Sequence, residues 1–362
     1  MRFLHTADWQ IGMKAGNLGK VAEEVRAARL DTVRRIQVLA REQEVEFVVV
    51  AGDTFEDHGV SRKLVAQVGD VLGGFDCDVY VIPGNHDPWV PGGVWDQARQ
   101  WRRAVHVLGE PTPVEVAGGC LYPCPLTERW SEKDPTEWIK VEKPEGIHVG
   151  IAHGSLRMAM GASPKNHPIM PKAASRAGLD YLALGDWHSV MEVSEGGPAV
   201  RMAYSGTPEP TSFGEVDSGY VLIVDIEARG SAPKISRHQV GALKWLNREC
   251  ALDGAGDLGR LIEELKRLPD PRRTLISIAL GGVLFAEEAE RLEDLSDVLS
   301  THFLYGRVDD KALIPAPQDD AWTTHLPEGV IRSVAERLKE EADSGRDPIA
   351  RQALFELYRL AN

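Results

Sequence analysis

Short apolar runs that end in a polar cluster recur along the first part of the chain. They cover Met1 to Thr6, Val45 to Val50 and Val79 to Ile82, and a loop rich in Asp, Asn and Gly follows each of them. Apolar runs of this length, bounded by such residues, are typical of buried strands. We therefore predict three buried strands, each of which delivers polar side chains at its carboxyl end.

Two segments between these runs have apolar residues at helical spacing. They are Val21 to Glu42 and Ser61 to Leu72, and charged residues are interleaved with the apolar ones in both. Both are predicted to be amphipathic helices, with Ser61 as the N-cap of the second. Strand, helix and strand in alternation indicate an α/β sheet, in which active sites form at the carboxyl ends of the strands.

Later runs indicate a second sheet. Ile147 to Ala152, Tyr181 to Leu184 and Gly219 to Ile226 have the composition of strands, and the first two lead directly into His153 and Gly185-Asp186. We expect these three segments to form one sheet that packs against the first. Residues 1–235 are thus predicted to be a two-sheet αββα sandwich.

The remainder of the chain has a different pattern. Residues 236–312 are predicted to form a small α+β capping domain, with strands and helices at Lys244 to Ala251, Asp257 to Arg267, Thr274 to Leu280, Ala286 to Leu299 and Phe303 to Val308. Residues 313–362 comprise a proline-containing acidic linker and two helices, Pro327 to Ala342 and Pro348 to Leu360. Both tail helices have an apolar stripe, which either closes the core of the cap or docks a partner helix.

Composition narrows the class of protein. The 362 residues include 43% hydrophobic and 27% charged residues and have a formal net charge of -14, which argues against a protein that coats nucleic acid through bulk positive charge. The negative net charge does not exclude a nuclease, because bound metal ions supply local positive charge. The four cysteines form no CxxC motif, and the first motif already begins at Asp8, so we expect no secretory signal. The longest apolar runs are strand-sized, so we expect no membrane span and a cytoplasmic location.

The polar clusters offer carboxylate, amide and imidazole groups suited to two divalent ions. Asp53 is the expected bridging carboxylate between the ions. The other ligands divide into two sets, Asp8, Gln10 and His188 for one ion, and Asn85, His153 and Asp186 for the other. A bridging water with a lowered pKa would be the nucleophile for attack on phosphorus. His86 would stabilise the phosphorane or protonate the leaving oxygen, and the alternative is that it only holds its loop.

These motifs carry a family resemblance. The segments Phe3 to Trp9, Gly52 to Phe55, Pro83 to Asp87 and Tyr204 to Glu215 resemble the calcineurin-like metallophosphoesterases of the SbcD-type, or meiotic-recombination, DNA-repair nuclease branch. The resemblance covers residues 1–226 or so. It implies a dimanganese nuclease core, a capping domain that helps to select DNA, and carboxyl-terminal helices that dock on an SMC-like (SbcC-type) ATPase. It also implies a homodimer.

Two positions depart from the pattern of that family. Gln10 and Asp186 stand where the branch usually has histidine. Gln10 offers only a neutral amide oxygen, so it is either a weak ligand or a hydrogen-bond donor behind the ligands. Asp186 adds a carboxylate to the ligand set, or alternatively orients His188. An oxygen-rich set favours Mn²⁺, with Mg²⁺ or Fe²⁺ as alternatives, over zinc.

The sequence therefore predicts a metal-dependent phosphodiesterase that cleaves DNA as an exonuclease or endonuclease, in repair or processing. Two alternatives stay open. One is a phosphodiesterase for nucleotides or other small esters, which the acidic balance favours. The other is a weakly active structural subunit of an SMC-like ATPase complex, which the changed ligands Gln10 and Asp186 favour.

Overall fold

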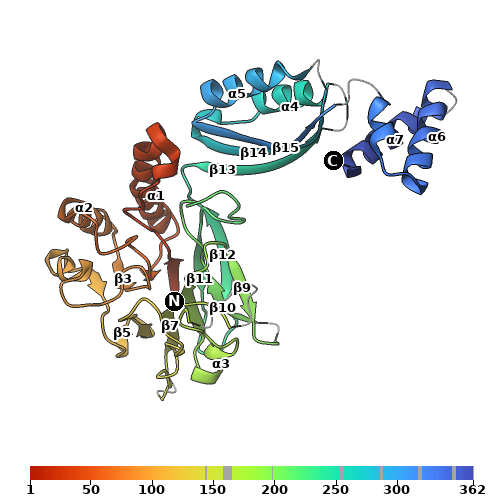
Figure 1. Cartoon of the computed structure of the whole chain (residues 1–362). Helices are drawn as coiled ribbons and strands as arrows, with labels where there is room; N and C mark the ends of the chain where they lie inside the picture. Colours follow the sequence, from red (N-terminus) through yellow and green to blue (C-terminus); the bar gives the residue numbers. More distant parts are fainter. Residues whose placement is uncertain are drawn as a thin grey trace. The chain divides into compact units, whose positions relative to one another are not determined.

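The computed structural model describes residues 1–142, 145–157, 165–197, 199–252, 254, 256–285, 288–316, 320–344 and 348–361. The chain divides into two compact units, Met1–Lys244 and Trp245–Asn362 (Figure 1). Each unit has a hydrophobic core of its own. The three-part division expected from the sequence, with boundaries after residues 235 and 312, stays a prediction.

The first sheet has six strands in the order β12-β11-β1-β2-β3-β4. They are β1 (Arg2–Thr6), β2 (Phe47–Ala51), β3 (Asp78–Ile82), β4 (Val105–Val107), β11 (Tyr220–Asp225) and β12 (Lys234–Gln239). β1 to β4 run parallel, whereas β11 and β12 are antiparallel to their neighbours. β2 is buried along its whole length, as in parallel sheets that are covered on both faces. The three strands predicted first are confirmed, with ends that differ by at most two residues.

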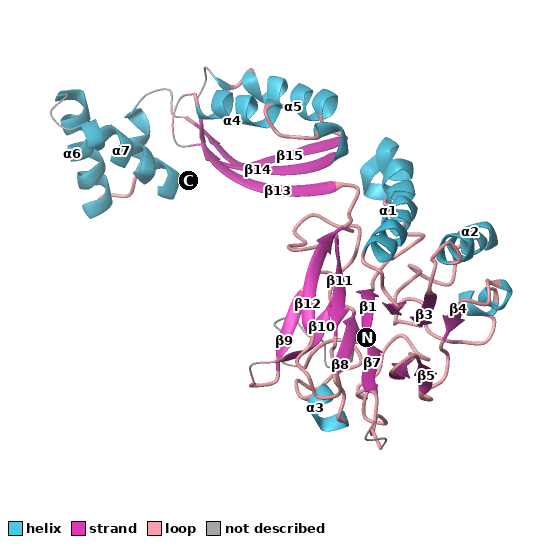
Figure 2. Cartoon of the chain, turned by 180° about the vertical axis from the view of Figure 1, so that it is seen from behind, coloured by secondary structure: helices cyan, strands magenta, loops and turns pink. Residues whose placement is uncertain are grey.

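The second sheet also has six strands, in the order β5-β6-β7-β8-β10-β9. They are β5 (Val114–Val116), β6 (Gly119–Cys124), β7 (Ile147–His153), β8 (Tyr181–Gly185), β9 (Met191–Ser194) and β10 (Val200–Tyr204). The four inner strands run parallel, and β5 and β9 are antiparallel edges. The strands predicted at Ile147 to Ala152 and Tyr181 to Leu184 are confirmed here (Figure 2).

The strand predicted at Gly219 to Ile226 forms, but its assignment to the second sheet was wrong. It is β11, and it pairs antiparallel with β1 in the first sheet, with Leu4 opposite Ile223. The residue pattern of this segment predicts a strand but does not determine which strand pairs with it. Pairing between distant segments depends on backbone hydrogen bonds and packing. β11 therefore lies beside β1, the strand that leads into Asp8.

Helices cover the outer faces of the two sheets. α1 (Ala22–Glu42) and α2 (Arg62–Leu72) pack on the first sheet, and the short α3 (Ala173–Ala177) packs on the second. The Ser61 side chain accepts a hydrogen bond from the backbone N–H of Leu64 at 3.2 Å, which confirms the predicted N-cap. Single turns of 3₁₀ helix occupy Gly16–Val21, Val94–Asp96 and Ala98–Gln100. The core between the sheets includes Phe3, Val49 and Val149, so the first unit is an αββα sandwich.

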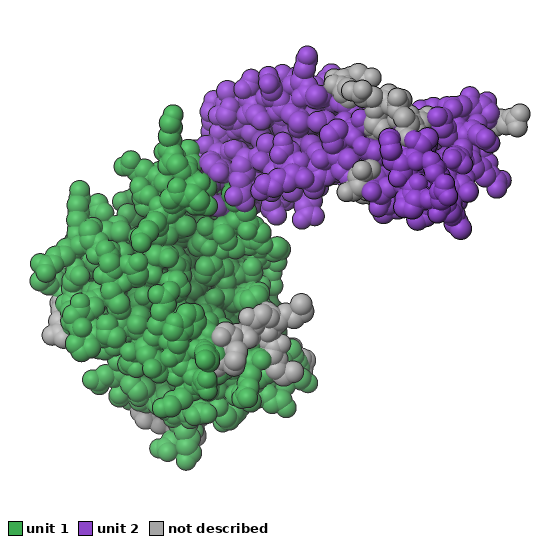
Figure 3. Space-filling model, in the orientation of Figure 1, with its two compact units in different colours: residues 1–244 green, residues 245–362 purple. Residues whose placement is uncertain are grey.

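The second unit, purple in Figure 3, combines a three-stranded sheet with helices. The sheet has the order β13-β14-β15, formed by β13 (Lys244–Leu252), β14 (Thr274–Leu284) and β15 (Tyr305–Pro315). Helices α4 (Asp257–Lys266) and α5 (Arg291–His302) pack on it, and a 3₁₀ turn spans Pro271–Arg273. The predicted start of the α5 helix at Ala286 lies outside the described residues.

The tail consists of a 3₁₀ helix at Asp320–His325 followed by α6 (Val330–Ser344) and α7 (Pro348–Ala361). Both predicted tail helices are confirmed, and α6 begins three residues after the predicted Pro327. Across the described ranges of the chain, no helix combines the length and apolarity that a membrane span requires.

Candidate metal centre

The candidate ligands come from loops at the carboxyl ends of parallel strands. β1 leads into Asp8 and β2 into Asp53 in the first sheet, whereas β7 ends at His153 and β8 leads into Asp186 in the second. Two hydrogen bonds join the sheets at this edge. The His153 Nδ1–H donates to the Ala51 carbonyl at 2.9 Å, and the Asp186 backbone N–H lies 3.1 Å from both carboxylate oxygens of Asp8. The two sheets thus bring the four loops into one site.

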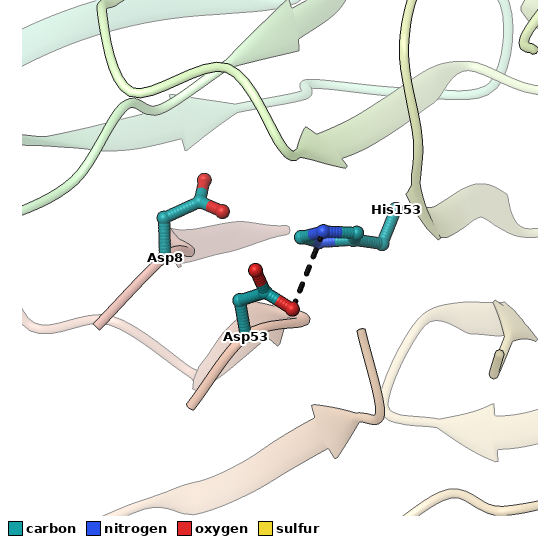
Figure 4. Close-up of side chains that lie close together, drawn as sticks. All are labelled: Asp8, Asp53 and His153. Carbon is teal, nitrogen blue, oxygen red and sulfur yellow. Dashed lines mark ion pairs between the residues drawn. The ribbon is translucent and has the colours of Figure 1, made fainter. Parts of the chain in front are cut away.

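Three of the loop residues form its centre (Figure 4). Asp8, Asp53 and His153 are buried, and each has a ligand atom within 4.8 Å of those of the others. The Nε2 of His153 lies 3.5 Å from Oδ1 of Asp53. Carboxylate oxygens and imidazole nitrogen are donors for divalent transition metals, so these residues fit a metal ion.

The electrostatics of this group match a cation site. Burial raises the pKa of Asp8 to about 6, although His153 and His188 oppose the rise. Burial lowers the pKa of His153, but the carboxylates of Asp53, Asp8 and Asp186 outweigh that effect and raise it to about 9. Without a metal ion, protons on His153 therefore compensate the buried negative charge. A divalent cation would take over that role and displace them.

His153 is held so that Nε2 is directed at the centre. Because the Ala51 carbonyl accepts the hydrogen bond of Nδ1–H, the neutral ring has its lone pair on Nε2. That atom lies 3.1 Å from the amide oxygen of Asn85. The amide nitrogen of Asn85 donates to the side-chain oxygen of Asn166 at 3.0 Å, which turns the oxygen of Asn85 inward. Asn166 thus fixes which amide atom of Asn85 faces His153, and the ligand role of Asn85 stays a prediction.

The loop of Asn85 and His86 is closely packed against Asp53. A Cβ atom at Gly84 would lie 2.2 Å from Oδ1 of Asp53, so only glycine fits there. The buried carboxylate of Asp87 accepts hydrogen bonds from the backbone N–H groups of Gly84 at 2.7 Å and Phe55 at 2.9 Å. Burial raises the pKa of Asp87 to about 7, and Asp53 adds to the rise. Asp87 was not expected from the sequence as a support for the site.

His86 has a fixed position beside the centre. Its backbone N–H donates to Oδ1 of Asp53 at 2.9 Å, and its ring Nδ1 lies 3.0 Å from the carbonyl of Glu56. The carbonyl orients the ring and leaves Nε2 for other partners. His86 therefore holds its loop and also keeps a ring nitrogen available, so both interpretations made from the sequence are compatible with its geometry.

Gln10 contacts the centre through its amide nitrogen. The residue is buried, and Nε2 donates to Oδ2 of Asp53 at 2.9 Å. In this orientation the side chain supports the Asp53 carboxylate, as expected of the alternative in which Gln10 is a donor behind the ligands. A ligand role for Gln10 stays a prediction.

Asp186 is anchored by two residues that were not expected from the sequence. Its carboxylate accepts hydrogen bonds from Ser155 Oγ and Asn166 Nδ2, both at 2.7 Å. Its Oδ1 lies 3.9 Å from Nε2 of His153. The carboxylate therefore faces the centre from the edge of the second sheet, where neutral donors compensate its charge. Its role as a ligand stays a prediction.

His188 has a carboxylate partner, and this partner is Glu215. The Nδ1 of His188 lies 2.8 Å from Oε1 of Glu215 and 3.1 Å from Oγ1 of Thr211. Burial lowers the pKa of His188, but the hydrogen bond with Glu215 and the charge of Asp8 raise it to about 9. The structure thus places Glu215 at Nδ1, where the alternative from the sequence expected Asp186. A carboxylate on Nδ1 would leave Nε2 as the atom that faces a metal ion, and the role of His188 as a ligand stays a prediction.

A buried arginine ties two of the site loops together. Arg29 of α1 donates to the carbonyl of Trp9 at 2.8 Å and to that of Pro210 at 2.9 Å. Burial lowers the pKa of Arg29 to about 10, against the opposing charges of Glu209 and other acids. The loop of Asp8 and the segment that supplies Thr211 are thereby held by one side chain. The carboxylate of Glu209 accepts hydrogen bonds from the backbone of Ala242 and Leu243, at 2.6 and 3.0 Å.

Comparisons with known proteins agree with this geometry. A model of the calcineurin-like phosphoesterase family matches residues 1–190. The uncharacterized metallophosphoesterase YhaO of Bacillus subtilis (strain 168) is 26% identical over 240 residues, which cover 62% of this chain and 57% of that protein. The SbcD component of nuclease SbcCD from the same organism is 23% identical over 267 residues, with 62% and 66% covered. The corresponding SbcCD component of Rhodobacter capsulatus is 28% identical over 293 residues, with 65% and 68% covered. The chain thus spans less than two thirds of the first two relatives.

Proposed function

From the premise that the chain belongs to the calcineurin-like phosphoesterase family, and is thus a metal-dependent phosphoesterase, we propose that it hydrolyses phosphodiester bonds of DNA. The observation that carries the proposal is the buried group of Asp8, Asp53 and His153, which lies among further imidazole and amide side chains. The similarity to two components of SbcCD nucleases favours DNA over other esters.

In the proposed site, each residue has a distinct part. Asp53 would be shared by the two ligand sets and contact both ions. Asp8 and His188 would complete one set, with Gln10 as a ligand or as the donor that steadies Asp53. The second set would be His153, Asn85 and Asp186. The metals are proposed to be Mn²⁺, since carboxylate and amide oxygens dominate the donors.

The chemistry follows from these positions. When bound, divalent ions lower the pKa of a water molecule and neutralise charge on the phosphodiester. His86 is held by Asp53 through its backbone and by the Glu56 carbonyl through Nδ1. Its Nε2, when protonated, would donate to the leaving oxygen and be reprotonated from solvent after release. His86 is therefore the proposed catalytic residue of the protein itself.

The test is hydrolysis of labelled single- and double-stranded DNA and of bis-p-nitrophenyl phosphate with added Mn²⁺. We expect DNA cleavage, and a loss of at least about a hundredfold in the variant Asp53→Asn. The exposed Asp31 on α1 supplies the matched control Asp31→Asn, which should cleave as wild type does. Cleavage of the small ester without DNA would replace the proposal with the small-ester alternative, which the net charge of -14 favours. Metal binding without hydrolysis of either substrate would contradict the proposal and support the structural-subunit alternative instead.

The tail helices support a second part of the proposal, docking on an SMC-like ATPase. α6 and α7 expose apolar side chains, namely Val330, Ile331, Val334, Ile349 and Leu360. Ala335, Ala350 and Leu354 of the same helices are buried, so part of their apolar surface does close an intramolecular core. The exposed remainder has no such role and favours an external partner. The double variant Ile331→Ser and Ile349→Ser in the full chain should lose co-purification with the ATPase and keep DNA cleavage. Val38 on α1 is similarly exposed and supplies the control Val38→Ser.

A homodimer stays a prediction, which light scattering of the purified chain would test.

A further inference from the structure

Two exposed tryptophans lie on loops beside the metal centre. Trp130 is 55% exposed and Trp187 is 39% exposed, whereas Trp9 and Trp95, which follow strands of the first sheet, are buried. Burying an indole is strongly favourable, so an exposed indole leaves a large apolar surface without a protein partner. Trp9 and Trp95 pack in the core, whereas Trp130 and Trp187 are accessible to a ligand.

The exposed indoles occur on both sides of the ligand His153. Trp130 follows β6 and Trp187 follows β8, and β7, which ends at His153, lies between these two strands in the sheet. All three strands run parallel, so their carboxyl ends meet at one edge. The loops that carry the two tryptophans therefore begin on either side of His153 along that edge.

The segment of Trp130 is fixed to the metal centre by hydrogen bonds. The backbone of Ser131 donates to the carbonyl of Lys165 and accepts from the N–H of His167, both at 2.9 Å. Between these two residues lies Asn166, whose side chain contacts Asp186 at 2.7 Å and Asn85 at 3.0 Å. Trp130 therefore directly precedes Ser131, whose backbone pairs with the segment of Asn166. Asn166 in turn contacts the proposed ligands Asp186 and Asn85.

The chemistry of the Trp130 position matches a nucleobase. The guanidinium carbon of Arg129 lies 5.8 Å from the centre of the Trp130 ring, which places a cation over an exposed indole. Indole and guanidinium planes are the groups on which unpaired bases stack, whatever their sequence. The chain carries a net charge of -14, so attraction of phosphates by bulk positive charge cannot supply the affinity. Stacking can supply affinity without a positively charged surface.

We propose that Trp130 and Trp187 stack unpaired bases on either side of the phosphodiester held at the metal centre. The inference rests on the proposed function and names its substrate class as single-stranded nucleic acid. In a duplex the bases stack on one another and present no free face to an indole. The ends and unpaired regions of DNA offer such faces. Binding through stacking also predicts a weak dependence of affinity on salt concentration.

Binding of two fluorescent oligomers of equal length and charge would test the inference. One is oligothymidylate, and the other has abasic sites in place of every base. With Ca²⁺ in place of Mn²⁺, and with intactness checked on a gel, wild type should bind oligothymidylate about tenfold more tightly. Trp130→Ala should lose that preference and leave the affinity for the abasic oligomer unchanged. Trp130→Phe should restore most of it, because an aromatic face returns.

Val38→Ala supplies the control, since Val38 is an exposed apolar residue of α1 in the same unit. It should keep the preference for bases. Trp187→Ala should also lower the preference, with Mn²⁺ affinity measured in parallel because its neighbours are proposed ligands. Equal loss for both oligomers in Trp130→Ala, or no loss for either, would overturn the inference. If the stacking test fails but the wild-type protein cleaves DNA, the proposed function stands and only the stacking inference is refuted. If the wild-type protein prefers bases but does not cleave DNA, the proposed nuclease activity is refuted and the stacking inference stands.

Discussion

Replacing Glu215 with glutamine isolates the charge that supports His188. The variant keeps the size of the side chain and its ability to accept the backbone N–H of Thr211, which lies 2.8 Å from Oε2. It removes the negative charge that lies 2.8 Å from Nδ1 of His188. The neutral amide no longer stabilises positive charge on the ring, whether a proton or a metal ion carries that charge.

The pKa of His188 gives the scale of the effect. Burial lowers this pKa, and Glu215, Asp8 and Asp53 together raise it by more, so the net rise from 6.5 to about 9 corresponds to roughly 3 kcal/mol in favour of positive charge on the ring. Loss of a supporting carboxylate of this kind typically weakens metal binding by about 10–100-fold, or about 1.4–2.8 kcal/mol. We therefore expect Glu215→Gln to weaken Mn²⁺ binding at the site that contains His188 by a factor in that range.

Titration calorimetry with Mn²⁺ measures the change, and melting temperature shows that the variant is folded. The exposed Glu110 supplies the matched control Glu110→Gln, for which we expect wild-type affinity. Added Mn²⁺ should restore activity to Glu215→Gln, because the lost interaction affects binding of the ion. A folded variant with unchanged Mn²⁺ affinity would refute the reasoning and remove His188 from the ligand set.

Three further outcomes follow from the same site. In metal-free protein the raised pKa values of Asp8, His153 and His188, about 6, 9 and 9, mean that the folded state binds protons more tightly than the unfolded state. The contribution of Asp8 is therefore lost between about pH 4 and pH 6 and that of the two histidines between about pH 6.5 and pH 9, so the melting temperature in EDTA should fall across that range. A flat profile would contradict this. Gly84→Ala places a Cβ atom 2.2 Å from Asp53 Oδ1, so calorimetry should show a stability loss of about 1–3 kcal/mol. Elemental analysis of protein expressed without added metal should not find stoichiometric zinc, and zinc held tightly in both sites would refute the oxygen-rich ligand set.

The sequence predicted the elements that lead into the site, because their signals are local. Parallel strands buried on both faces are continuous apolar runs, and a polar residue directly after such a run marks the carboxyl edge. Asp8, Asp53 and His153 were found in this way, and the structure brings their ligand atoms within 4.8 Å of one another.

The supporting residues escaped prediction because their partners are distant in the chain. Arg29 lies on an amphipathic helix among charges that face solvent, and nothing local distinguishes it from them. Its buried guanidinium contacts the backbone of Pro210, 181 residues away. Glu215 belongs to a segment that the resemblance included, yet its role depends on the folded position of His188. The placement of β11 was missed for the same reason, since its partner β1 opens the chain.

The two departures from the family pattern have compensating surroundings. Asp186 adds a negative charge to a buried site, and Ser155 and Asn166 donate to both of its oxygens. Gln10 removes an imidazole, and its amide donates to the oxygen of Asp53 that would otherwise have lost a partner. Each change therefore alters charge while the carboxylate oxygens of Asp53 and Asp186 keep polar neighbours, as low-dielectric sites require. Gln10 and Asp186 therefore fit a fully hydrogen-bonded polar centre, and the elemental analysis for zinc distinguishes a changed metal preference from a weakened site.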